Sequence, residues 1–178
     1  MSGGQPDQDV DLFRLAAEAG NALRARGWTL AAAESCTGGW VAKALTDVPG
    51  SSACFSGGIV AYANTIKRGL LGVSARDLEA HGAVSEVVAT AMARGALGRF
   101  SADIAVAVSG VAGPGASEGK PAGLVCFAWA WGREGPIATQ SLTRQFAGDR
   151  EAVRRASVRE ALAQTLSVVT RDIDRRGT

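Results

Sequence analysis

The sequence predicts an α/β protein, a three-layer α/β/α sandwich with a mixed, mostly parallel sheet. Short apolar runs of strand length alternate along the chain with longer segments whose apolar residues recur every three or four positions. Such alternation is typical of a largely parallel sheet that is covered by helices on both faces. Three strand ends are followed by polar or glycine-rich turns, and these are expected to meet at the carboxyl edge of the sheet, where ligands bind.

The chain begins with a polar segment and an amphipathic helix. Residues 1–8 are expected to be a disordered tail, and residues 9–174 form the single domain that a chain of 178 residues suits. One face of the first helix carries the apolar residues Leu12, Leu15, Ala16, Ala19 and Leu23. This helix ends near Gly27, the apolar run at 28–33 predicts a buried strand, and residues 40–45 predict a helix that a Pro-Gly pair ends.

The middle of the chain supplies a second strand and two more helices. Residues 51–58 are small and polar and fit either a loop or an edge strand. A strand is expected at 58–62, followed by a helix over 64–71 whose cap is Asn64. After a short helical turn and a loop, Ser85 caps a longer helix with an apolar inner side.

The last part of the chain completes the sheet. The run at 103–108 predicts a central strand, and the runs at 123–129 and 137–144 predict two further strands. The sequence Gly-Arg-Glu-Gly-Pro between the last two has the composition of a hairpin turn, so the sheet is expected to be mixed. A final helix over 149–172 carries a buried stripe of valines and leucines.

Composition excludes several classes of function. The formal net charge is only +2, and Lys and Arg are spread along the chain, so we expect no nucleic-acid partner. Cys36, Cys54 and Cys126 stand far apart and His81 is the one histidine, which argues against a metal site or a disulfide framework. We expect no metal and no other cofactor. The sequence has no signal peptide and no apolar run of spanning length, so we expect no membrane partner and a cytoplasmic location.

Ser35 stands where the first strand gives way to a helix. The first N–H groups of such a helix and the positive end of its dipole suit an oxyanion or a phosphate beside Ser35. Gly38 and Gly39 leave room for a ligand to approach the backbone. Ser35 is therefore a candidate nucleophile, and the alternative is a helix cap followed by glycines that only ease packing. Cys36 is a rival nucleophile, ranked lower, because a thiol at a helix N-terminus has a lowered pKa but no histidine neighbours it.

Tyr62 and Lys67 flank the second junction between a strand and a helix. Lys67 is preferred to His81 as a general base, because His81 lies in a loop next to no other signal. A lysine accepts a proton only when it is neutral, so burial must lower its pKa. The apolar neighbours Ile66 and Leu70 make such burial conceivable. The alternatives are a surface lysine and a core tyrosine.

The third junction is a glycine-rich loop after the central strand. Its candidate ligand contacts are Ser109, Gly110, Ala112, Gly113 and Gly115, and the alternative is a plain turn. Arg150 lies in the first turn of the last helix, where the dipole disfavours a cation unless an anion compensates. Glu151 and Glu160 or a ligand phosphate could supply that anion. Arg150 is assigned to the rim of the site, and Arg155 and Arg159 to a solvated face.

Six segments follow one another along most of the chain: AESCTGG, PGSSACFSGGIVAYANTIKRGLLGV, GAVSEVVATAMARGA, AVSGVAGPG, KPAGLVCFAWA and FAGDREAVRRA. Together they resemble the CinA C-terminal-domain family, which includes nicotinamide mononucleotide deamidases of pyridine nucleotide salvage. The resemblance implies metal-independent hydrolysis of nicotinamide mononucleotide to nicotinate mononucleotide and ammonia. It also implies a catalytic set that maps onto Ser35, Tyr62 and Lys67. Many relatives carry a further N-terminal domain that resembles molybdopterin-binding proteins, and we expect a stand-alone form here.

The implied mechanism starts with attack of Ser35 on the carboxamide carbon. Lys67, assisted by Tyr62, accepts the proton and later delivers one to the departing ammonia. The expected oxyanion donors are the backbone N–H groups of Thr37, Gly38 and Gly39. Water then releases the acyl enzyme, and the substrate phosphate lies against the loop at 109–115 or against Arg150.

Two alternative functions stay open at this point. One is a non-catalytic binding or regulatory module of the competence and damage-inducible type, because a fold alone does not separate it from an enzyme. The other is an amidase for a different substrate. The family loop usually continues with glycines after Gly-Pro-Gly, whereas here Ala116-Ser117-Glu118-Gly119 follows, which would favour that second alternative. We expect a small-molecule nucleotide as the partner, and exposed edge strands leave a homo-oligomer open.

Overall fold

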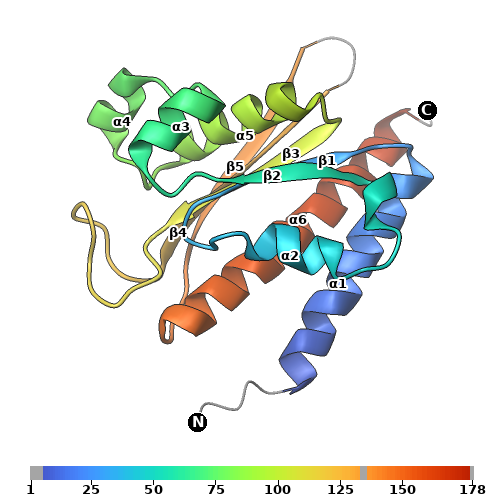
Figure 1. Ribbon diagram of the computed structural model, residues 1–178, viewed down its shortest axis with the longest axis horizontal. Coiled ribbons are helices and arrows are strands. Elements are labelled where there is room, and N and C mark those ends of the chain that lie inside the picture. The colour runs from blue at the N-terminus through green and yellow to red at the C-terminus, as the bar shows by residue number, and fades with distance from the viewer. Residues whose placement is uncertain (1–5, 133–135, 177–178) are drawn as a thin grey trace.

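A five-stranded sheet in the order β2-β1-β3-β4-β5 forms the centre of the computed structural model, which describes residues 6–132 and 136–176 (Figure 1). The strands are β1 (Leu30–Glu34), β2 (Phe55–Val60), β3 (Ile104–Gly110), β4 (Leu124–Trp131) and β5 (Ala138–Gln145). β1 pairs in parallel with β2 and β3, whereas β4 pairs antiparallel with β3 and β5. This arrangement confirms the predicted α/β class with a mixed sheet.

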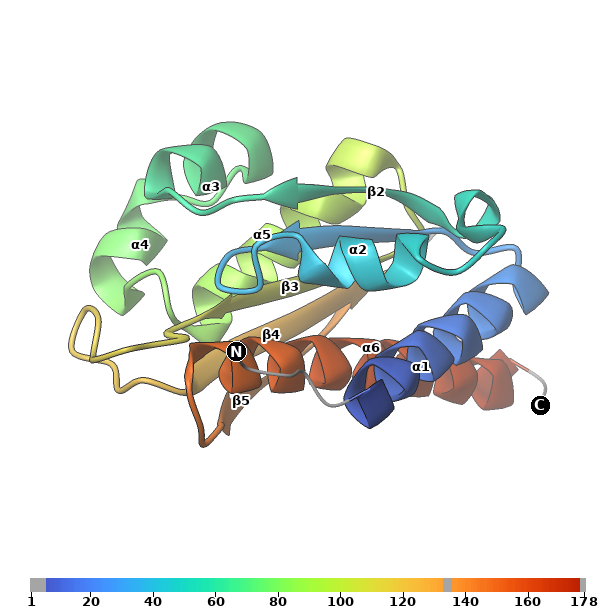
Figure 2. The same ribbon diagram turned by 60° about the horizontal axis from the view of Figure 1, so that its bottom comes forward.

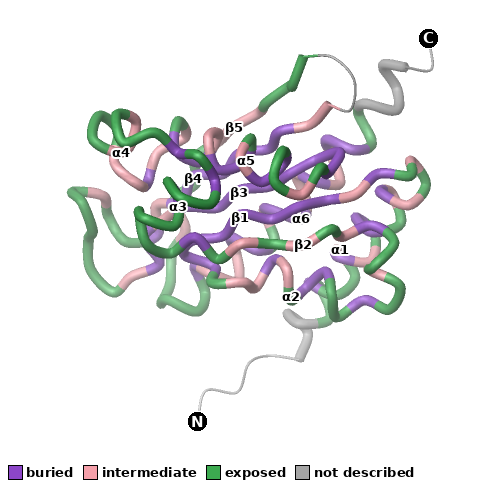
Figure 3. Tube along the Cα trace, turned by 45° about the horizontal axis from the view of Figure 1, so that its top comes forward, coloured by how far each residue is buried: buried purple, intermediate pink, exposed green. Residues whose placement is uncertain are grey.

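Helices cover both faces of the sheet. They are α1 (Pro6–Ala25), α2 (Trp40–Thr46), α3 (Asn64–Leu71), α4 (Ala75–His81), α5 (Glu86–Phe100) and α6 (Arg150–Arg176), with a short 3-10 turn η1 (Ser51–Ala53). Figure 2 shows α1, α2 and α6 on one face and α3, α4 and α5 on the other. The burial colours of Figure 3 follow these layers, since β1, β3 and β4 are buried while the edge strand β2 is partly exposed.

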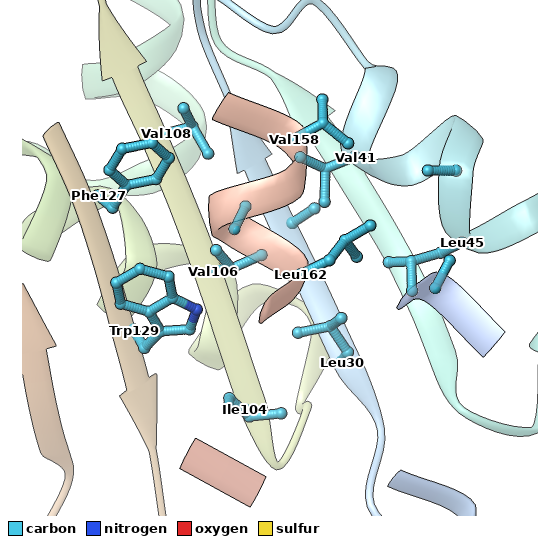
Figure 4. Close-up of a cluster of buried hydrophobic side chains, with 14 of the residues drawn as sticks. Leu30, Val41, Leu45, Ile104, Val106, Val108, Phe127, Trp129, Val158 and Leu162 are labelled. Carbon is cyan, nitrogen blue, oxygen red and sulfur yellow. The ribbon is translucent and has the colours of Figure 1, made fainter. Parts of the chain in front are cut away.

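The two faces of the sheet carry side chains of different size. Large residues fill the side of α1, α2 and α6, where Trp129 is fully buried, stacks on Phe127 and donates from Nε1 to Thr165 Oγ1 at 3.0 Å (Figure 4). The opposite face is lined mostly by alanines, including Ala31, Ala33, Ala105, Ala107, Ala128 and Ala130. Small side chains let α5 lie close to the sheet.

Helix α3 in turn lies close to α5. A Cβ added at Gly95 of α5 would stand 2.0 Å from the carbonyl oxygen of Leu71, so the backbone of α3 touches α5 where a side chain is missing. The same helix carries Lys67 one turn before Leu71. Packing on the alanine face therefore fixes the position of Lys67.

Several boundaries differ from the expectations. Helix α1 begins at Pro6, inside the segment 1–8 expected as a tail, while residues 1–5 lie outside the described residues. The strand β3 continues through Ser109 and Gly110, expected in a loop, because both residues pair with β4. Residues 51–58 form η1 and then the start of the edge strand. The centre of the expected hairpin turn, 133–135, lies outside the described residues.

Candidate active site

A cavity of about 420 Å³ opens at the carboxyl ends of β1 and β3. From β1 the chain crosses to β2 at one edge of the sheet, and from β3 it passes to β4 toward the other edge. Open α/β sheets form ligand sites at such a switch in strand order. The three catalytic candidates Ser35, Tyr62 and Lys67 all line it. It is also lined by the binding candidates Cys36, Ser109, Gly110, Ala112, Gly113, Gly115 and Arg150. Thr37, Gly38 and Gly39 do not line this cavity.

The amino end of α2 is occupied by a carboxylate of the protein itself. Glu34 ends β1 and is only 2% exposed. Its two oxygens accept hydrogen bonds from the backbone N–H groups of Gly39, Val41 and Ala42 at 2.9 to 3.1 Å. An internal anion thus satisfies the helix end that the sequence suggested for a ligand. The two glycines allow this return of the backbone, since Gly38 and Gly39 have φ values of +63° and +93°.

The oxyanion donors expected in this turn are therefore partly used. Gly38 N–H donates to the carbonyl of Ser35 at 3.1 Å, and Gly39 N–H donates to Glu34. Within the described residues, the N–H groups of Cys36 and Thr37 donate to no protein oxygen. The donors that stay available are those directly after Ser35.

Replacing Glu34 with Ala is expected to lower the free energy of unfolding by about 3 kcal/mol, because three buried N–H groups lose a charged acceptor. The turn that carries Ser35 should loosen, so kcat should fall as well. Urea unfolding with circular dichroism measures the first effect, and Glu79→Ala, at an exposed position of α4, is the matched control. Equal stability of Glu34→Ala and wild type would contradict this role.

Ser35 and Lys67 form a buried pair at the base of the cavity. Lys67 Nζ lies 3.2 Å from Ser35 Oγ, and the lysine side chain is 1% exposed. Two backbone carbonyls, those of Ala61 and Tyr62, also accept from Nζ at 2.8 and 3.1 Å. Among the described residues, no carboxylate forms an ion pair with Lys67. Burial lowers the pKa of the Lys67 amine from its usual value, and Glu118 and Cys36 oppose that shift.

The burial of Lys67 has a different cause from the one expected. Helix α3 buries two side chains, Lys67 and Leu71, one turn apart on a single face. Ile66 and Leu70, whose apolar character suggested burial, are 36% and 39% exposed. Lys67 is buried because it lies on the same face of α3 as Leu71, the face that packs toward α5 and the base of the cavity.

Tyr62 enters the site in two ways. Its backbone carbonyl accepts from Lys67, whereas its ring is 60% exposed. The Tyr62 hydroxyl accepts from the Arg150 guanidinium at 3.2 Å, and Arg150 also donates to the Gly113 carbonyl at 2.6 Å. Within the described residues, the tyrosine hydroxyl makes no hydrogen bond to Lys67 or Ser35. Arg150 thus joins two of the loops around the cavity at its rim.

Helix α6 also contacts the turn that carries Ser35, through Arg154. The sequence analysis did not single out this arginine. Arg154 donates to the Thr37 carbonyl at 2.8 Å, one turn after Arg150. The signal for it was the spacing of four residues, which places both guanidiniums on one face of the helix. The expected local neutralisation holds for Arg155, which pairs with Glu151 at 3.1 Å, while Glu160 pairs with Arg144 instead.

Two other candidates are set aside by the structure. The prediction of a lowered thiol pKa was wrong, because α2 begins only at Trp40 and burial raises the pKa of Cys36 to about 12. His81 ends α4 in an exposed position and does not line the cavity. In residues 6–132 and 136–176, no three His, Cys, Asp or Glu side chains gather as a metal site would need. No helix in this part of the chain is both long and apolar enough to cross a membrane.

Two polar residues of the cavity escaped the sequence analysis. Asn64 was expected to cap α3, but the cap is Ala63, and Asn64 lines the cavity from the first helical position. Glu118 lies in the loop between β3 and β4, and its carboxylate accepts from the N–H of Ala83 at 3.0 Å. The local sequence does not predict the contact of Glu118, since 35 positions separate it from Ala83.

Comparisons with known proteins agree with the fold and identify similar proteins. The CinA C-terminal domain profile matches residues 12–169. The nicotinamide-nucleotide amidohydrolase PncC of Escherichia coli K12 is 52% identical over 161 residues, which cover 89% of this chain and 94% of the relative. PncC of Enterobacter agglomerans is 54% identical over 80% of this chain and 86% of its own.

Solved structures give the same result. The competence damage-inducible protein A of Klebsiella pneumoniae superposes with a TM-score of 0.83 at 44% identity, over 88% of this chain and 95% of that one. A competence/damage inducible protein of Agrobacterium tumefaciens gives a TM-score of 0.82 at 41% identity, over 96% and 99% of the two chains.

Proposed function

This chain belongs to the CinA C-terminal domain family, and from that premise we propose that it is a nicotinamide-nucleotide amidohydrolase. The reaction is the hydrolysis of the carboxamide of nicotinamide mononucleotide to nicotinate mononucleotide and ammonia. The observation that carries the proposal is the buried contact of 3.2 Å between Lys67 Nζ and Ser35 Oγ in the cavity. A module that only binds a ligand gains nothing from a buried lysine, whose desolvation costs free energy.

The hydrogen bonds of Lys67 suit a general base. A neutral amine has two N–H donors and one lone pair, and the carbonyls of Ala61 and Tyr62 offer acceptors for both donors. The lone pair is then left for the hydroxyl of Ser35, the third neighbour of Nζ. In this protonation state Ser35 donates its proton to Lys67, as nucleophilic attack requires. The lowered pKa of Lys67 favours the neutral form.

The proposed reaction has two stages. Ser35 Oγ attacks the carboxamide carbon while its proton passes to Lys67, and Lys67 then protonates the nitrogen, which leaves as ammonia. Water attacks the resulting ester and gives one proton to Lys67, which passes it to Ser35 Oγ as the ester bond breaks. The nicotinic acid that forms loses its remaining proton to solvent and leaves as the carboxylate. The N–H group of Cys36 is the proposed oxyanion donor, because Cys36 lines the cavity and this N–H donates to no protein oxygen among the described residues.

Arg150 is the proposed contact of the substrate phosphate. Two of its five N–H donors point to the Gly113 carbonyl and the Tyr62 hydroxyl, so three are left for a ligand. A guanidinium at the rim of the cavity suits a dianionic phosphate at the far end of the nucleotide from the carboxamide. In this assignment Tyr62 orients Arg150 and also holds Lys67 through its backbone carbonyl.

The proposed function is tested by ammonia release from nicotinamide mononucleotide. Wild-type protein should release one ammonia for each nicotinate mononucleotide formed, and EDTA should leave the rate unchanged. A rate that EDTA abolishes would contradict the metal-independent mechanism. The absence of any release by folded protein would overturn the substrate assignment and return the amidases for other substrates and the binding module to consideration.

A further inference from the structure

We propose that Glu118 is a specificity residue that recognises the positively charged pyridinium ring of the substrate and favours the substrate over the product, which carries an added carboxylate. The inference rests on the proposed function and deepens it. Glu118 is the one acidic side chain among the described residues that line the cavity. The two basic side chains there, Lys67 and Arg150, serve the reacting bond and the phosphate in the proposal above.

The carboxylate of Glu118 is held in place by a hydrogen bond and by packing. Its Oε2 accepts from Ala83 N–H at 3.0 Å, in the turn between α4 and α5. A Cβ added at the neighbouring Gly82 would stand 3.1 Å from the same oxygen, so the carboxylate packs directly against that turn. Its other oxygen accepts no hydrogen bond from the described residues. Glu118 thus keeps an unused acceptor in the cavity wall.

The two outer charged side chains of the cavity, Glu118 and Arg150, are held by separate hydrogen bonds. Glu118 is tied to Ala83, whose carbonyl in turn accepts from Ser109 Oγ at 2.7 Å. Arg150 is tied to Tyr62 and Gly113. A ligand that fits this pattern carries a positive charge in one part and an anion in another.

Nicotinamide mononucleotide has that charge pattern. The ribose is attached to the ring nitrogen, which makes the nicotinamide ring a cation, and the phosphate lies at the other end of the ribose. The reacting carboxamide is on the same ring, so the positive charge enters the cavity whenever the carboxamide reaches Ser35. The charge of Glu118 is felt at the base of the cavity, because it opposes the lowering of the Lys67 pKa. A bound ring excludes water and strengthens the attraction between ring and carboxylate.

The reaction adds a repulsion to this attraction. A neutral carboxamide enters and a carboxylate is formed on the same carbon, while the ring keeps its positive charge. Glu118 therefore attracts the ring of both nucleotides but repels the new carboxylate of the product. The same residue thus favours the substrate over nicotinate mononucleotide.

The test compares wild type with Glu118→Gln, which keeps an oxygen for the Ala83 N–H and removes only the charge. KM for nicotinamide mononucleotide should rise about fivefold, the size of one partly exposed charge interaction. The product-inhibition constant of nicotinate mononucleotide should change less than KM, because attraction to the ring and repulsion of the carboxylate oppose each other in the product. The acidic limb of kcat/KM should move to lower pH because Lys67 loses a neighbouring anion. Glu79→Gln makes the same charge change on α4, outside the cavity, and should change none of these values.

Calorimetric binding of the two nucleotides to wild type and Glu118→Gln separates this inference from the proposed function. A larger loss of affinity for the substrate than for the product in the variant would support Glu118 even if wild type released no ammonia. Equal affinities of the two proteins for both nucleotides would overturn the role of Glu118, whether or not wild type is active. A loss of thermal stability without any shift in these affinities would reduce Glu118 to a structural contact.

Discussion

Ser35→Ala is expected to lower kcat for nicotinamide mononucleotide by about 10⁴-fold or more, with little change in KM. The hydroxyl is the proposed nucleophile, and Ala removes it without disturbing the backbone that carries the N–H groups of Cys36 and Thr37. Glu34 keeps the turn in place, because its three hydrogen bonds do not involve the Ser35 side chain. Steady-state ammonia release measures the effect, and mass spectrometry of quenched wild type should detect the acyl group on Ser35.

Ser52→Ala provides the control for that substitution. Ser52 lies exposed in η1, away from the cavity, so the same change of hydroxyl to hydrogen should leave kcat unaltered. Ser35→Ala with more than a few per cent of the wild-type kcat would mean that water, rather than Ser35, attacks the carboxamide. The cavity and Lys67 would then have to act on a water molecule.

Lys67→Met is expected to lower kcat/KM by about 10³-fold, the usual contribution of a general base. Met fills a similar volume in the buried position but has no basic nitrogen to accept the Ser35 proton. Wild-type kcat/KM should rise with pH as Lys67 loses its proton, since burial places its pKa below the usual value. The residual rate of Lys67→Met should lack this rise. A pH profile of both proteins measures the difference.

The same substitution should change how stability depends on pH. Between the folded pKa of Lys67 and its usual value, the unfolded chain binds more protons than the folded one, so wild-type stability rises with pH in that window. Lys67→Met should lose that rise. Lys43→Met is the matched control, because Lys43 is exposed on α2 and pairs with Asp47.

A Lys67→Met protein within tenfold of wild-type activity would exclude Lys67 as the base.

The meeting of Ser35 with Lys67 could be predicted because it depends on strand order and local pattern. Both residues follow strands, and parallel neighbours bring their carboxyl ends to one edge of the sheet. The pattern could not predict which hydrogen bonds each polar group makes. The amino end of α2 looked free for a ligand, yet Glu34, one residue before Ser35, folds back onto it. The available signal for this contact was a run of alanines that ends in an acidic residue and is soon followed by two glycines.

Contacts between distant parts of the chain could not be predicted from the sequence. Arg154 reaches Thr37 across 117 positions, and Glu118 reaches Ala83 through a loop without regular structure. Such contacts depend on how helices dock on the sheet and on how loops close, and neither leaves a periodic trace in the residues. Arg150 was predicted at the rim because one local rule, the helix dipole, applied to it.

The missing side chain at Gly95 bears on how this protein can vary during evolution. Any larger residue there must push away the turn of α3 that holds Leu71, and Lys67 shares that short helix. Gly95 does not line the cavity, yet a side chain there would displace the helix that carries the proposed base. Under the proposed mechanism, a lineage can therefore lose turnover through a substitution at a packing position while every residue that faces the substrate is unchanged. The presence of Ser35, Tyr62 and Lys67 at the matching positions of a relative would then not guarantee activity.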